Sequence, residues 1–224
     1  MDRVHWLRWD WATQFTKHRK GFKKHKHTLT MHSAAGAAHV HAGMQLKRCA
    51  MGLGFWALER IPANTVVLIE KPLMLPRARD STVDAMFELI KLALERRRDA
   101  FLQLVPHVRE GYQVMDYALM RDAHLRWLPH VSQGDAQLYA SKYMRNAFGS
   151  AQGPALLFQG AMFNHSCSPN TLFSMQKGAF VFRTCRDVPK GQQLFDRYGH
   201  GHKDECDTAY HQRLFAQYGF RCKC

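Results

Sequence analysis

The most informative stretch of this sequence is Asn164-His165-Ser166-Cys167-Ser168-Pro169-Asn170. Its first three residues form an N-glycosylation sequon, which is used only in secreted proteins. His165 and Cys167 are two positions apart, so on an extended chain their side chains point the same way, as in a Cys-His nucleophile pair. No cysteine-protease signature surrounds them. The meaning of the stretch therefore depends on the segments around it.

The segments after Gly153 have the pattern of short strands. They are residues 155–158, 170–175 and 179–185. Lys177-Gly178 is typical of a hairpin turn between the last two strands. Pro189-Lys190-Gly191 predicts another turn before residues 192–195, and residues 208–218 are expected to form one short helix.

The segments before the motif begin with strands and continue with helices. Residues 49–58 and 65–70 predict two strands joined by a turn at Pro62-Ala63-Asn64. Between residues 81 and 104, apolar side chains recur at three- and four-residue steps, which predicts a helix, and a second helical pattern covers about residues 135–148. Residues 106–134 have no defined pattern. Short strands that flank a helical insert indicate the α+β class.

Charge is concentrated near the start of the 224-residue chain. Residues 1–48 contain ten Lys/Arg and two Asp, a net of +8 out of the total of +14. The densest run, residues 18–27, is compatible with a solvated disordered extension, a nuclear-localisation signal, an organellar presequence or a patch that binds nucleic-acid phosphates. No stretch approaches the roughly 18 to 20 apolar residues of a membrane span, so we expect no membrane partner.

The six cysteines favour a reducing compartment, since no secretory signal precedes them and their spacing is uneven. We expect a nuclear or cytoplasmic protein. Cys222 and Cys224 form a close pair that is typical of metal ligands rather than of a disulfide. Cys49 and Cys185 are expected to be buried as small apolar side chains.

Taken together, these sequence segments resemble SET-domain protein lysine methyltransferases over about residues 46–224. The shared features are a Gly-x-Gly turn, a helical insert, the Asn-His-Ser-Cys-x-Pro-Asn stretch, a tyrosine at 198 and a Cys-x-Cys end. The SET-and-MYND (SMYD) group is the most similar, because its Arg-x-x-Leu-x-x-x-Tyr-x-Phe-x-Cys-x-Cys pattern is matched from Arg213 to Cys224. The insert has no cysteines at 77–145, so the MYND zinc finger is missing, and Gln192-Gln193 replaces the usual acidic pair.

The resemblance implies a SET-domain β-fold of small sheets with a knot-like crossing, a helical insert and a partial post-SET segment. The expected segments are a basic extension (1–44), the N-terminal part of the SET domain (45–76), the helical insert (77–148), the C-terminal part of the SET domain (149–210) and the partial post-SET segment (211–224).

The resemblance also implies the site. Tyr198 takes the position of the catalytic tyrosine, whose hydroxyl and nearby carbonyls steer a methyl group. Tyr218 and Phe220 would wall the lysine channel, with Phe220 against adenine. The residues implied to bind S-adenosylmethionine are Met51, Gly52, Leu53, Gly54, Asn164, His165, Tyr218 and Phe220.

A zinc ion is implied as a second bound group. Cys167, Cys222 and Cys224 match three of the four family thiolates, and the fourth would fall beyond Cys224. Zinc requires four tetrahedral ligands, so either the sequence is a fragment, or Cys206, a histidine such as His200 or His202, or water takes the last position.

The implied activity is methyl transfer from S-adenosylmethionine to a lysine of a protein substrate, histone or non-histone. Two alternatives remain open at this point. One is a SET-type protein-binding module that has lost turnover, and the other is a basic protein that binds nucleic acid through its N-terminal run.

Overall fold

The computed structural model describes residues 37–49, 52–75, 82–105, 116–150, 153–199, 208–218 and 220–222. The strands are β1 (Ala37–Val40), β2 (Met44–Cys49), β3 (Gly52–Ala57), β4 (Val66–Glu70), β5 (Ala147–Phe148), β6 (Ala155–Leu156), β7 (Asn164–His165), β8 (Thr171–Gln176), β9 (Ala179–Thr184) and β10 (Phe195–Asp196). The helices are α1 (Thr82–Arg96), α2 (Arg98–Gln103), α3 (Tyr117–Trp127), α4 (Gln133–Asn146), α5 (Thr208–Tyr218) and a 3₁₀ turn, η1 (Gly160–Met162).

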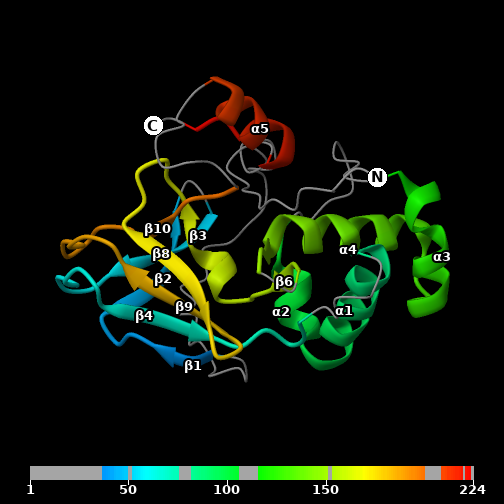
Figure 1. Cartoon of the computed structure of the whole chain (residues 1–224), viewed down its shortest axis with the longest axis horizontal. Helices are drawn as coiled ribbons and strands as arrows, with labels where there is room; N and C mark the ends of the chain where they lie inside the picture. Colours follow the sequence, from blue (N-terminus) through cyan, green and yellow to red (C-terminus); the bar gives the residue numbers. More distant parts are fainter. Residues whose placement is uncertain are drawn as a thin grey trace, which may run out of the picture.

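The strands form several small sheets, and the largest is antiparallel with the order β1-β4-β9-β8. Its β8–β9 hairpin turns at Lys177 and Gly178, which both have positive φ, as the sequence predicts for this turn. Most strands lie on the left of the view, α1 to α4 lie on the right with β6 beside them, and α5 lies at the top (Figure 1). The α+β class of small sheets with a helical insert is confirmed.

The main sheet begins earlier than the sequence indicates. β1 pairs with β4 in the range Ala37 to Val40, whereas the sequence analysis placed these residues in the extension that ends at residue 44. Small residues give no alternating pattern, so the pairing depends on an edge that β4 provides and not on a local signal. Residues 1–36, which include the basic run, lie outside the described part of the chain.

The two strands expected at 49–58 and 65–70 are arranged differently from the prediction. Cys49 ends β2 and pairs with Gly52 at the start of β3, so the chain reverses between them. Gly52 has a φ of 100°, which glycine adopts without steric cost. β4 pairs with β1 and β9 and not with β3. The Gly-x-Gly pair therefore belongs to the β2–β3 hairpin.

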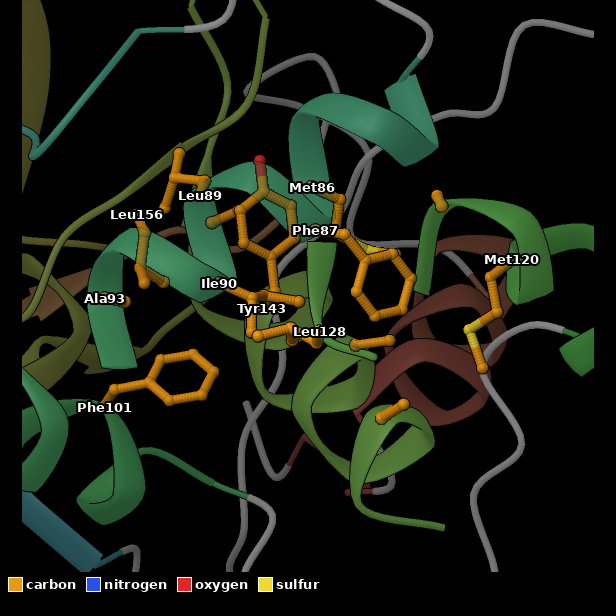
Figure 2. Close-up of a cluster of buried hydrophobic side chains, with 14 of the residues drawn as sticks. Met86, Phe87, Leu89, Ile90, Ala93, Phe101, Met120, Leu128, Tyr143 and Leu156 are labelled. Carbon is orange, nitrogen blue, oxygen red and sulfur yellow. The ribbon is translucent and has the colours of Figure 1, made fainter. Parts of the chain in front are cut away.

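The helical insert has its own apolar core, drawn in Figure 2. Side chains of α1 meet Phe101 of α2, Met120 of α3 and Tyr143 of α4 there, and all are fully or nearly fully buried. The helix expected at 81–104 is broken at Arg97, whose φ of −145° is not helical. No glycine or proline marks this break in the sequence. α3 lies in the stretch where no pattern was recognised.

One buried carboxylate connects the sheet to the segment that leads to residue 164. Glu70, at the end of β4, accepts hydrogen bonds from the backbone N–H groups of Phe158, Gln159 and Gly160 at 2.7 to 3.2 Å. Burial raises the pKa of Glu70, while these three N–H groups oppose the rise. The start of η1 is thus fixed against β4. Within the described residues, no helix is long and apolar enough to cross a membrane.

Candidate functional site

Two distant segments cross side by side at the centre of the site. β7 and β10 are parallel neighbours, with Asn164 opposite Phe195 and His165 opposite Asp196. Asn170 fixes the crossing, because its side chain donates to the carbonyl of Gln193 (2.9 Å) and accepts from the N–H of Phe195 (2.7 Å). The asparagine that ends the motif is therefore structural, and it aligns the segment that carries Tyr198.

Tyr198 lies directly after this crossing and is 2% exposed. Its hydroxyl donates to the carbonyl oxygen of Phe163 (2.7 Å), and its backbone N–H donates to Nδ1 of His165 (3.0 Å). Its carbonyl accepts from the hydroxyl of Tyr210 (2.6 Å). Burial raises the pKa of Tyr210, so that hydroxyl keeps its proton and remains a donor. Tyr198 is thereby held at both its backbone and its side chain.

An aromatic wall from the C-terminal segment covers Tyr198. α5 occupies the range that the sequence predicts for a helix, 208–218. The ring of Tyr218 lies 5.1 Å from that of Tyr198, and the ring of Phe220 lies 5.6 Å from the imidazole of His165. Tyr198, Tyr210, Leu214, Tyr218 and Phe220 form one buried cluster. The structure thus brings together Tyr198, Tyr218, Phe220 and His165 as the sequence analysis expects.

A tightly packed cradle against Asn164 is formed by Leu53, Gly54 and Gln193. The Asn164 amide donates to the carbonyl of Leu53 (3.1 Å), which places β7 against β3. A β-carbon on Gly54 would overlap Nε2 of Gln193 and would lie 2.7 Å from Nδ2 of Asn164. Gln193 is 3% exposed, and its Nε2 has no hydrogen-bond partner among the described residues. Any side chain at position 54 would therefore force the ends of Gln193 and Asn164 to move. Met51 lies outside the described residues.

A third cluster, next to the aromatic wall, has the composition of a metal centre. Sγ of Cys167 lies 3.5 Å from Sγ of Cys222, 3.4 Å from Nε2 of His165 and 3.6 Å from Nε2 of His211. Ser166 accepts from the N–H of Ser168 (3.1 Å), which forms the turn that presents Cys167. Thiolate and imidazole are the ligands that zinc prefers. The predicted ligand Cys224 and the candidates His200, His202 and Cys206 lie outside the described residues.

Comparison with known proteins agrees with this geometry. A sequence model of the SET domain matches residues 52–199. This chain belongs to the SET domain family. A SET domain-containing protein of Acanthamoeba polyphaga mimivirus is 32% identical over 186 residues, which cover 77% of this chain and 72% of the relative. Human protein-lysine N-methyltransferase SMYD4 is 38% identical over 65 residues, which make up 29% of this chain and 8% of SMYD4.

Solved structures share the fold at low sequence identity. The SET domain of LSMT bound to MeLysine and AdoHcy superposes with a TM-score of 0.62 at 12% identity. It covers 84% of this chain, which spans 54% of the length of that structure's chain. Rubisco LSMT bound to AdoMet superposes with a TM-score of 0.57 at 14% identity. These matches establish the SET fold for this chain.

The SET domain contains three features that the sequence analysis missed or placed wrongly. Cys185 is exposed and not buried, because it follows the last residue of β9. The Phe163 carbonyl beside Tyr198 was not identified, although it directly precedes Asn164. The proximity of His211 Nε2 to Cys167 Sγ (3.6 Å) was not foreseen, since a histidine inside a predicted helix has no motif that marks it.

Proposed function

We propose that this protein transfers a methyl group from S-adenosylmethionine to a lysine side chain of a protein substrate. The observation that carries this proposal is the buried oxygen pair formed by the Tyr198 hydroxyl and the Phe163 carbonyl, 2.7 Å apart. Phe163 directly precedes Asn164, which lies against the cradle at Gly54. Relatives named as lysine methyltransferases, and solved structures bound to AdoMet and lysine, support the same reaction.

The cradle fits the cofactor that this reaction requires. Gly54 leaves room for close backbone approach, and the buried Nε2 of Gln193 is a donor without a partner among the described residues. The residues that would hold S-adenosylmethionine are Gly52, Leu53, Gly54, Asn164, the backbone of His165 and the ring of Phe220. The imidazole of His165 is already engaged by the N–H of Tyr198.

The chain's own groups have defined tasks in such a transfer. When bound, S-adenosylmethionine would supply a methyl group activated by its sulfonium sulfur. The lone pair of a neutral lysine amine would bond to the methyl carbon in line with the C–S bond, whose electron pair would return to sulfur, so that the positive charge passes from sulfur to nitrogen. The oxygens of Tyr198 and Phe163 accept weak C–H···O contacts that align the methyl carbon. The aromatic wall excludes water, which lowers the pKa of a substrate amine from about 10.4 and favours its neutral form.

Labelled methyl transfer tests the proposed function. The full chain is incubated with methyl-labelled S-adenosylmethionine and a mixed protein extract, and N-methyllysine is then sought by mass spectrometry. We expect label on lysine side chains of acceptor proteins. Cofactor binding without incorporation would contradict catalysis and would favour the SET-type binding module instead.

Replacing Gly54 by Ala is expected to weaken cofactor binding at least about tenfold, because a misplaced positioning group can cost that much or more. The new methyl group would displace the ends of Gln193 and Asn164, while the backbone of Gly54 has no positive φ to strain. Calorimetric titration with S-adenosylhomocysteine measures the loss.

The matched control for this variant is the double replacement of Gly54 and Gln193 by Ala, which removes the larger overlap. It should regain part of the lost affinity, since the two positions are in contact. Wild-type affinity in the single variant, with unchanged thermal unfolding, would rule out the cradle as the cofactor site.

We further propose that Cys167, Cys222 and Cys224 bind a structural zinc ion. A tetrahedral zinc ion with ordinary Zn–S bonds separates two sulfurs by about 3.8 Å. The 3.5 Å between Cys167 and Cys222 is close to this value and far from a disulfide bond, so the described part of the donor set fits. The ion would fasten the segment after α5 to the turn after β7.

A further inference from the structure

We propose that the exposed pair of Phe215 and Arg221 binds a carboxylate of the protein substrate, so that the lysine to be methylated has an acidic residue near it in the sequence. The pair is formed by α5 and the short segment that follows this helix. The inference rests on the proposed function and deepens it by naming the chemical class of the substrate.

The pair holds a guanidinium group in a defined position on the surface. Phe215 is 48% exposed, and Arg221 is exposed as well. The Cζ atom of Arg221 lies over the Phe215 ring, 5.2 Å from its centroid, which is within the range of a cation–π contact. A single exposed phenylalanine is ordinary on a protein surface. Here, however, its ring orders the planar guanidinium and leaves the N–H donors at the edge of that plane available.

These donors are not used by an acidic side chain of the protein. Among the residues that the structure describes, Arg221 contacts the Phe215 ring and forms no ion pair. From Thr208 to Cys224 the sequence contains three Lys/Arg and no Asp or Glu, so this segment supplies no carboxylate of its own. The fork of N–H groups on a guanidinium matches the two oxygens of a carboxylate. An acidic side chain of a partner therefore fits the pair.

The pair lies on the outer side of the wall that covers Tyr198. Phe220 is 7% exposed and its ring lies 5.6 Å from the imidazole of His165, whereas the next residue, Arg221, is exposed. Phe215 likewise follows a leucine of the buried cluster that contains Tyr198. A substrate whose lysine reaches Tyr198 would therefore place neighbouring residues close to Arg221.

A second exposed arginine adds positive charge to this part of the surface. Arg186 donates to the Oγ atom and the carbonyl of Ser168 (3.1 and 2.7 Å), which are both uncharged acceptors. Ser168 follows Cys167, whose sulfur contacts that of Cys222, the residue after Arg221. Together with the net charge of +14, these arginines disfavour a basic substrate segment and attract an acidic one.

A panel of synthetic peptides tests this preference on the full chain. Each peptide has one lysine in a frame of Ala, Ser and Gln, with Glu at one of the successive positions on either side; its matched partner has Gln there. Labelled methyl transfer gives kcat and KM, and fluorescence anisotropy with S-adenosylhomocysteine bound gives affinity. We expect at least one Glu peptide to exceed its Gln partner by about fivefold or more in affinity and in kcat/KM, through KM, because an ordered guanidinium binds a carboxylate with two hydrogen bonds. The difference should shrink at high salt, since the pair is exposed.

Charge variants assign the preference to one residue. Arg221→Gln should remove the preference for Glu, and Arg221→Lys should keep only part of it, because an ammonium group keeps the charge but lacks the planar fork. Lys190→Gln is the matched control: it removes the same charge from an exposed position in the turn after β9 and should keep the full preference.

Equal binding of Glu and Gln peptides by the wild type, or a preference for Glu that persists in Arg221→Gln, overturns the inference. Binding of a DNA duplex that Arg221→Gln abolishes, without any preference for Glu peptides, would assign the arginine to nucleic acid and overturn it as well. A wild-type chain that prefers Glu peptides through Arg221 but methylates none of them would refute the proposed function and leave the acidic binding preference intact.

Discussion

Tyr198→Phe is expected to lower the turnover of methyl transfer by about 10² to 10³, the usual cost of removing one preorganised polar group from a reacting centre. The change deletes only the hydroxyl that donates to the Phe163 carbonyl at 2.7 Å. The ring remains, with its packing against Tyr218 at 5.1 Å. Cofactor affinity should therefore stay within about twofold of the wild type, which is the pattern of a group that acts in the transition state.

Tyr143→Phe provides a matched control for this experiment. Tyr143, on α4 of the helical insert, is another buried tyrosine, and its hydroxyl donates to the carbonyl of Pro154 (2.8 Å). Single-turnover rates and cofactor titrations are compared for both variants. Turnover that is unchanged in Tyr198→Phe, or that falls equally in Tyr143→Phe, would show that the Tyr198 hydroxyl has no special role.

Much of the fold could be predicted because its signals are local. Lys177-Gly178 supplies the backbone conformation of a tight hairpin, and the helix at 208–218 has a sufficient periodic pattern. The motif at 164–170 was also interpretable, since Asn170 makes hydrogen bonds that few other residue types reproduce.

The missed elements depend on distant partners. β1 is a strand because β4 offers it an edge, and nothing within Ala37–Val40 indicates this. The break at Arg97 follows from the way α1 and α2 pack around Phe101 and not from a helix-ending residue. Tertiary context overrides local propensity at both places.

The candidate site likewise contains residues that a sequence motif indicates and residues that only the folded structure brings together. Tyr198, Asn164 and Cys167 were predictable because a sequence resemblance covers them, but the Phe163 carbonyl contributes through its backbone, which any residue type provides. The closeness of α5 to Cys167 becomes visible only when the helix is placed beside the turn after β7. Residues that act through position, and not through an unusual side chain in a motif, require the folded structure.

Cys167→Ser is expected to abolish zinc binding and to loosen the aromatic wall without unfolding the sheets. Cys167 is the sulfur that Cys222, His165 and His211 all face, so its loss removes the centre of the cluster. The cluster around Tyr210 and Tyr218 would still pack α5 against the domain, but the connection to the turn after β7 would be lost. We expect its amides to exchange at least about tenfold faster, as segments with few remaining contacts do.

Turnover should fall with that loosening, because Tyr198 loses the Tyr210 hydroxyl that fixes its carbonyl at 2.6 Å. Prolonged chelation of the wild type should reproduce both effects, since the same ion is removed. Cys185→Ser is the matched control: this exposed cysteine contacts the Pro169 carbonyl (3.4 Å) near the same turn and is not among the residues of the metal cluster. Hydrogen exchange of the α5 amides, with the β9 amides as the internal reference, is measured together with zinc content in Cys167→Ser, in Cys185→Ser and in the chelated wild type. If α5 exchange were unchanged in Cys167→Ser while zinc was lost, the metal would not hold the wall, and the link from the cluster to Tyr198 would have to run through His165 alone.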